Sequence, residues 1–350
     1  MIRSKFLIGR IIFLISVILI LCVGCSGAKD APETESELQA ESVEEPSKVD
    51  LHIETQEELM ELLIQPVSDR EAAMLEKCDI RLSDADIRED ETVLNFLILI
   101  TDEEEEGYSS DANVDALMIL SLDKAERKMR LVSLERGMGV PVNTGGESPV
   151  EDDLMHSLNY GNETFLLETM ENVLKIDVNY FIRMSRYTLV RLMDEMGGVD
   201  IALTKEEASA LNGEGISISK TAQMMVEGNN HMEGSDAIQY ALLHLELDDT
   251  AFVQRQRNTV RAMIDAAGDL SILQLKDSML SLSYLVRKNI NRDGIFKLVT
   301  YAPAVLGNTF EELTLPLEGS FGVTTTEKEN WIYAVDYMEN VKALHEFLYE

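Results

Sequence analysis

The sequence contains few cysteines and few positive charges. Three cysteines in 350 residues exclude a fold that depends on a disulfide framework. There are 30 lysines and arginines against 64 aspartates and glutamates, which gives a formal net charge of −34. Such a charge repels polyanions, so nucleic-acid binding is excluded as a main activity. The apolar content of 45% supports a large buried core and excludes an intrinsically disordered chain.

Common catalytic motifs are also missing. The sequence has no G-x-S-x-G elbow, no Walker loop and no G-x-G-x-x-G turn, which removes the usual signatures of α/β-hydrolases, P-loop enzymes and dinucleotide-binding enzymes. The histidines do not have the spacing of a zinc site; they are His52, His156, His231, His244 and His345. Any chemistry must therefore depend on other residue types.

The N-terminus departs from the acidic character of the rest. The first 29 residues contain no acid, and three basic residues precede an apolar run from Ile11 to Val23. This run is shorter than the roughly 20 residues of a transmembrane helix and is typical of a signal peptide. The motif that follows, Leu21-Cys22-Val23-Gly24-Cys25-Ser26, resembles a bacterial lipobox, in which Cys25 would become the lipid anchor.

Two interpretations of residues 1–25 stay open, a lipoprotein signal peptide and an uncleaved signal anchor with its basic end inside the cell. Both place the protein on the extracytoplasmic face of the bacterial membrane, attached through its N-terminus. Cys78 would then be an unpaired thiol. Residues 26–50 are rich in acids and predict a disordered linker, and the apolar spacing in 51–91 predicts a helical lead-in.

The remaining residues, 92–350, predict one α/β domain. Short apolar runs alternate with helical patterns, which favours an α-β-α sandwich with helices on both faces of a central sheet. The expected strands are Val93–Thr101, Ala116–Leu122, Met129–Leu134, Asn179–Met184, Gly198–Leu203 and Trp331–Val335. The expected helices are Thr164–Leu174, Arg186–Met196, Gly234–His244, Ala251–Ala267, Ile272–Ser283 and Gly294–Leu306.

Two acidic residues flank the first two expected strands. Asp102 directly follows the first strand, and Asp115 directly precedes the second. If they meet at a sheet edge, they can hold a hard cation such as Mg²⁺ together with phosphate oxygens. The alternative is that both are solvated loop acids, because strand ends also collect aspartate for turn formation.

The domain contains the following blocks, in this order: Val93–Asp102, Asn113–Leu120, Leu131–Arg136, Met196–Asp200, His231–Tyr240 and Arg255–Arg257. This ordered set resembles the LytR-CpsA-Psr (LCP) family. The resemblance implies a central mixed sheet and an Mg²⁺-dependent enzyme that moves a glycopolymer from a polyprenyl-pyrophosphate carrier to peptidoglycan. It implies that Asp102 and Asp115 bind the metal. It also implies that Arg136, Asp249 and Arg255 are catalytic.

The chain departs from the family pattern at four arginine positions, which are occupied by Asn113, Leu242, His244 and Phe252. Arginines at such a site stabilise the charge of a pyrophosphate leaving group, and losing one preorganised donor typically lowers a rate by about 10² to 10³. Two functions therefore stay open. One is a phosphotransferase of the LCP type, and the other is a catalytically degenerate lipoprotein that binds polyprenyl-linked intermediates or partner cell-wall proteins.

Overall fold

The computed structural model describes residues 79–145, 148–213, 224–243, 245, 249–270, 283–291, 294, 297, 301, 310–326 and 330–350. Four expected features lie outside these residues: the signal or anchor segment with Cys25, the acidic linker, Cys78, and residues 272–282 of the helix expected at 272–283. Of the expected helical lead-in, residues 79–91 are described, and they form an extended segment. Its isolated bridges pair Arg81 with Asp336 and Arg88 with Ile176. Among the described residues, no helix is long and apolar enough to cross a membrane.

A six-stranded mixed sheet forms the centre of the protein, in the order β10-β3-β2-β1-β6-β9. Strands β1, β2 and β3 form an antiparallel meander, whereas β6 runs parallel to β1 and β10 runs parallel to β3. The expected α/β class and its mixed central sheet are therefore confirmed. The strands are β1 (Val93–Thr101), β2 (Val114–Asp123), β3 (Lys128–Leu134), β6 (Tyr180–Ser185), β9 (Arg287–Lys288) and β10 (Phe310–Leu315).

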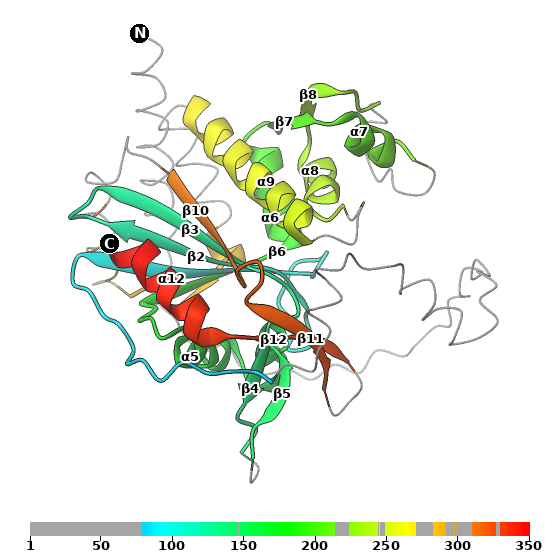
Figure 1. Ribbon diagram of the computed structural model, residues 1–350. Helices are drawn as coiled ribbons and strands as arrows, with labels where there is room; N and C mark the ends of the chain where they lie inside the picture. Colours follow the sequence, from blue (N-terminus) through cyan, green and yellow to red (C-terminus); the bar gives the residue numbers. More distant parts are fainter. Residues whose placement is uncertain are drawn as a thin grey trace, which may run out of the picture.

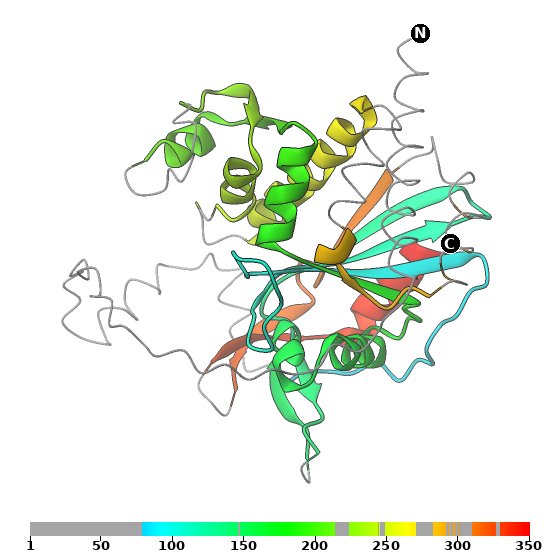
Figure 2. The same ribbon diagram turned by 180° about the vertical axis from the view of Figure 1, so that it is seen from behind.

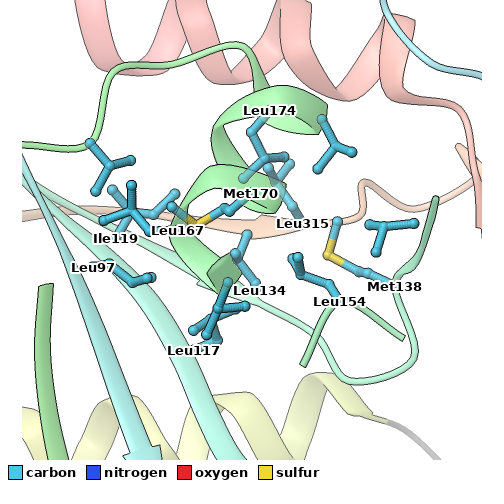
Figure 3. Close-up of a cluster of buried hydrophobic side chains, with 14 of the residues drawn as sticks. Leu97, Leu117, Ile119, Leu134, Met138, Leu154, Leu167, Met170, Leu174 and Leu315 are labelled. Carbon is cyan, nitrogen blue, oxygen red and sulfur yellow. The ribbon is translucent and has the colours of Figure 1, made fainter. Parts of the chain in front are cut away.

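Helices cover both faces of this sheet, because its apolar strands are buried on both sides. Helices α5 (Glu163–Leu174) and α12 (Tyr337–Tyr349) cover one face. Figure 3 shows the side chains of α5 that meet Leu97 and Ile119 in a buried cluster. On the other face, Val260 of helix α9 (Asp249–Asp269) packs against the cluster formed by Ala116, Met118 and Leu131. Figure 1 shows α9 and α12 on opposite sides of the strands.

A second apolar cluster lies beside α9 and is built from the middle of the chain. It joins helices α6 (Arg186–Glu195), α7 (Lys205–Leu211) and α8 (Gly234–Ala241) to the hairpin of β7 (Val199–Leu203) and β8 (Gly228–Met232). Figure 2 shows this group from behind, beyond one edge of the sheet. The smaller elements are β4 (Gly139–Val142), β5 (Val150–Asp153), η1 (Leu154–His156), α4 (Ser157–Tyr160), η2 (Ser283–Leu285), β11 (Phe321–Thr325) and β12 (Trp331–Val335).

One histidine near the C-terminus makes the fold sensitive to pH. The Nε2–H of His345 in α12 donates to the carbonyl oxygen of Lys175 at 2.8 Å, and burial lowers the pKa of the ring below 6.5. A lowered pKa means that the unfolded chain binds the proton more tightly. The ring therefore contributes stability that is complete above its unfolded pKa and is lost as the pH falls through its folded pKa.

We expect His345→Gln to reduce the loss of stability on acidification, because glutamine can keep the bond to Lys175 without binding a proton. The measurement is the urea midpoint of both proteins at pH 7 and pH 5. An equal loss in both proteins would show that His345 does not contribute to the pH dependence.

Candidate functional site

The sheet topology brings several of the expected site residues to one edge. Strands β1 and β3 run in the same direction, so their carboxyl ends meet the start of β2 at this edge. Asp102 follows β1, Asp115 lies at the start of β2, and Arg136 follows β3. Because β6 is parallel to β1, Arg186 at the start of α6 arrives at the same edge. We call Asp102, Asp115, Arg136 and Arg186 the sheet-edge site.

Asp115 occupies a β-bulge and is paired with an arginine. Ile100 pairs with Ala116 and Thr101 pairs with Val114, so Asp115 is the extra residue between them. A bulge re-aims the side chain of its extra residue. The buried carboxylate accepts two hydrogen bonds from Arg186, at 2.6 Å from Nε and 2.8 Å from Nη2. These bonds raise the pKa of Arg186, and this bidentate geometry is the strongest form of the arginine–carboxylate pair.

Asp102 is held by one of the residues that depart from the family pattern. Its carboxylate accepts hydrogen bonds from the backbone N–H of Asn113 at 2.9 Å and from the Asn113 side-chain amide at 2.7 Å. Asn113 is exposed and Asp102 is half-buried. Asn113 therefore orients the Asp102 carboxylate without adding a positive charge to the site.

Arg136 is the exposed cation of the sheet-edge site. Within the described residues its guanidinium makes no hydrogen bond or salt bridge. Its charge acts on the nearby Asp153, whose pKa is raised by burial and lowered to a smaller extent by hydrogen bonds and by Arg136. Asp153 itself accepts from the backbone N–H groups of Gly137 and Met155, at 2.8 and 3.0 Å. Arg136 is therefore available to an external anion.

Arg255, which was expected to be catalytic, forms its hydrogen bonds within the helical cluster. Its Nε donates to Glu207 at 2.9 Å and its Nη1 donates to the carbonyl of Leu243 at 2.7 Å, and the side chain is buried. Glu207 also closes the capping box at the start of α7. Arg257, two residues further along α9, donates through Nε to the hydroxyl of Ser133 in β3 at 2.9 Å, and this bond anchors the helix to the sheet. In this arrangement neither arginine contacts the sheet-edge site.

Of the other altered positions, Phe252 lies in α9 and Leu242 follows α8 as its C-cap. Phe252 is buried, and Leu242 is half-buried against the cluster of α6 and α8. Asp249 begins α9, but its side chain and the whole of His244 lie outside the described residues. Phe252 and Leu242 thus belong to the apolar packing in this structure.

The sequence interpretation missed the residues that neutralise the acidic loop after β1. Arg183 donates through Nη2 to Glu103 at 2.6 Å and through Nη1 to Glu163 at 2.9 Å. It also stacks on Tyr108, whose ring centroid lies 4.9 Å away. Glu104 lies 3.5 Å from Nη1 of Arg186. The two arginines therefore pair with two of the acids in this loop, Glu103 and Glu104. The signal in the sequence was the pair Arg183 and Arg186, which lie three residues apart on either side of the end of β6.

The expected Mg²⁺ does not fit this arrangement of side chains. A divalent ion at Asp102 and Asp115 needs carboxylate oxygens that face it. Both oxygens of Asp115 are already bound by Arg186, and a guanidinium at this place repels a second cation. In the described part of the chain, no group of three or more His, Cys, Asp or Glu side chains is arranged to hold a metal ion.

Comparisons with known proteins extend over most of the chain. The model of the LytR_cpsA_psr family matches residues 63–346. A polyisoprenyl-teichoic acid–peptidoglycan teichoic acid transferase TagU from Bacillus mycoides is 25% identical over 231 residues, which cover 65% of this chain and 69% of the relative. The TagU protein of Halalkalibacterium halodurans is 23% identical over 229 residues, which cover 64% and 70%.

Solved structures show the same fold at low identity. Protein gbs0355 from Streptococcus agalactiae has a TM-score of 0.60 at 19% identity and covers 73% of this chain and 88% of that one. TagV of B. subtilis has a TM-score of 0.56 at 18% identity, with coverages of 74% and 98%. The family protein YwtF (TagT), solved with bound octaprenyl pyrophosphate lipid, has a TM-score of 0.55 at 17% identity, with coverages of 77% and 96%.

Proposed function

The chain belongs to the LytR_cpsA_psr family, and we propose that it transfers a glycopolymer from a polyprenyl-pyrophosphate carrier to peptidoglycan on the outer face of the cell membrane. The observation that carries this proposal is the presence of two arginines at the same carboxyl edge of the sheet: Arg186, and the exposed Arg136, which makes no hydrogen bond or salt bridge within the described residues. Two guanidinium groups are the side chains best suited to the oxygens of a pyrophosphate. The lipid-bound relative and the TagU relatives favour this class of ligand.

In the proposed reaction, a hydroxyl of peptidoglycan attacks the phosphorus that carries the glycopolymer. The bond between this phosphorus and the bridging oxygen breaks, and polyprenyl monophosphate leaves with the electron pair. The hydroxyl proton passes to a carboxylate at the edge, for which Asp102 is the half-buried candidate. Arg136 and Arg186 bind the phosphate oxygens and stabilise the charge that grows on the leaving group.

The N-terminal segment fits this role. We propose that residues 1–25, through Cys25 or as a signal anchor, attach the protein to the membrane in which the lipid carrier resides. The acidic linker of residues 26–50 then gives the domain its reach toward peptidoglycan. The sheet-edge site would take the headgroup of the carrier, and the polyprenyl chain would remain in contact with apolar surroundings.

A second candidate function is binding without turnover. It is favoured because two arginines of α9 are already bound to other groups of the protein. Arg255 is paired with Glu207, Arg257 anchors α9 to the sheet, and Phe252 is buried in place of a cation. A site with fewer free cations stabilises a leaving pyrophosphate less strongly. In this function the protein holds polyprenyl-linked intermediates for a partner enzyme of the cell wall.

The test is a transfer assay with the full chain, a synthetic polyprenyl-pyrophosphate glycan and peptidoglycan oligomers. We expect Arg136→Gln to lower the transfer rate by about 10² to 10³, because it removes a preorganised charge from the transition state. Arg191→Gln is the matched control, because Arg191 is an exposed arginine of α6 that reaches Glu195 on the same helix. Its rate should equal that of the native protein.

Lipid binding measured by calorimetry separates the two functions. Binding with transfer supports the enzyme, and binding without transfer supports the second candidate. If the native protein neither binds nor transfers, both functions are rejected.

A further inference from the structure

We propose that Arg186 is the resident cation of the sheet-edge site. It occupies the place of a divalent metal at Asp115 and offers its remaining nitrogen to a phosphate oxygen of the ligand. Ligand binding at this site then requires no metal ion. The identity of the ligand rests on the proposed function, whereas the exclusion of the metal rests on the geometry of Arg186 alone.

The first argument is the bonding of Asp115. A carboxylate binds a metal ion and an arginine fork through the same pair of oxygens. Arg186 takes both oxygens, at 2.6 and 2.8 Å, and the aspartate side chain is only 7% exposed. A hydrated divalent ion would have to displace the guanidinium to reach a carboxylate that is this deeply buried. Asp102 is the remaining acid, and both hydrogen bonds from Asn113 hold it in place.

The second argument is the charge of the site. The positive charge of Arg186 is itself stabilised by Asp115, by Asp102 and by Glu104, so it acts as the counterion that these acids need. A divalent ion placed among the same acids would meet a fixed positive charge at short range. The arginine therefore competes with a metal directly, and it cannot dissociate from the protein.

The third argument is the position of the unused nitrogen. Nε and Nη2 of Arg186 bind Asp115, which leaves Nη1 facing Glu104 at 3.5 Å. That distance is longer than a good hydrogen bond, and the Glu104 side chain is 79% exposed. A phosphate oxygen can therefore replace Glu104 with little rearrangement. The start of α6 favours such an anion, since the backbone dipoles of a helix are positive at its N-terminus.

The backbone on both sides of Arg186 is held by hydrogen bonds of its neighbours, Ser185 and Tyr187. Ser185 ends β6 and caps α6 by accepting from the backbone N–H of Thr188 at 3.1 Å. The backbone N–H of Tyr187 donates to the carbonyl of Glu103 at 3.0 Å, which ties the start of α6 to the loop after β1. The backbone at Arg186 is therefore fixed to the loop that contains Asp102 and Glu103.

The experiment is a titration of the full chain with Mn²⁺, a spectroscopic substitute for Mg²⁺, followed by electron paramagnetic resonance. We expect the native protein to show no saturable site with a dissociation constant below about 1 mM, which is the weak end of protein sites for hard cations. Arg186→Met should create one site that binds Mn²⁺ at least about tenfold more tightly, since it frees Asp115 and removes the repelling charge. The double variant Asp115→Asn/Arg186→Met should lose that site. Arg191→Met, on the same helix, should behave as the native protein does.

Two results overturn the proposal. One is a saturable Mn²⁺ site in the native protein that Arg186→Met does not strengthen, and the other is a folded Arg186→Met without a new site. If Arg186→Met fails to fold, the native protein decides alone, because its affinity for a polyprenyl pyrophosphate should be the same within about twofold in EDTA and in Mg²⁺. A large dependence on Mg²⁺ would contradict a resident cation. Absence of lipid binding under both conditions would reject the proposed function. The Mn²⁺ titration would then be the test of whether Arg186 takes the place of a metal ion.

Discussion

Replacing Arg183 by methionine is expected to lower the free energy of unfolding by about 3 to 5 kcal/mol, the range for breaking a buried ion pair on one side. The Arg183 side chain is 3% exposed and contacts two carboxylates, those of Glu103 and Glu163. Its Nε also donates to the hydroxyl of Thr101, and Nη2 donates to the carbonyl of Ser109. The variant would leave the largely buried Glu103 carboxylate without this cation and would leave Glu163 with the partly exposed Arg287.

Arg287→Met is the matched control for this prediction. Arg287 contacts the same Glu163, at 3.1 Å, but its side chain is 48% exposed. Water screens such a pair, and we expect a loss of no more than about 1 kcal/mol. Urea unfolding of both variants measures the difference. Equal losses would mean that Arg183 contributes no more than a surface ion pair.

The second large effect is expected when an arginine is placed at one of the altered family positions. Phe252→Arg should lower the free energy of unfolding by about 3 kcal/mol or more, because it removes buried aromatic surface and buries a charge. Phe252 lies in α9 and is 3% exposed. Asn113→Arg at the exposed sheet edge should cost less than about 1 kcal/mol, which corresponds to the hydrogen bond to Asp102.

Thermal and urea unfolding of Phe252→Arg and Asn113→Arg provide the test. If both variants keep the native stability, Phe252 is not a packing residue and the site can regain a cation there without other changes. If only Asn113→Arg remains stable, the core of this protein requires an apolar side chain at position 252 and does not accept an arginine there. A charge then returns to the site most easily at the sheet edge.

Much of the framework follows from local sequence patterns. Val93–Thr101 is a mostly apolar run followed by Asp102, and it forms β1 with the expected bounds. The expected strand Trp331–Val335 is also confirmed as β12. Helix α6 begins at Arg186 as expected, where Ser185 supplies a side-chain cap. From the expected strands, Asp102 and Asp115 could meet at one edge of the sheet, and the alternative of two solvated loop acids stayed open.

The remaining features depend on contacts between distant residues. Strand β10 pairs with β3, and their partners Phe310 and Met129 are far apart in the sequence. No local pattern marks Asp115 as the extra residue of a bulge, and none pairs it with Arg186. The sequence therefore pointed to Asp102 and Asp115 but not to Arg186, the cation that binds Asp115. Arg255 was assigned to the site by family resemblance, and its partner Glu207 lies on a helix that was not expected.

The most direct measurement is a crystal structure of the protein with a polyprenyl pyrophosphate and Mg²⁺. The account predicts that the pyrophosphate lies at the carboxyl edge of β1 and β3, in contact with Arg136 and with Nη1 of Arg186. It also predicts that the pair of Asp115 and Arg186 remains intact. A pyrophosphate bound elsewhere, or a metal ion that separates Asp115 from Arg186, would contradict the account.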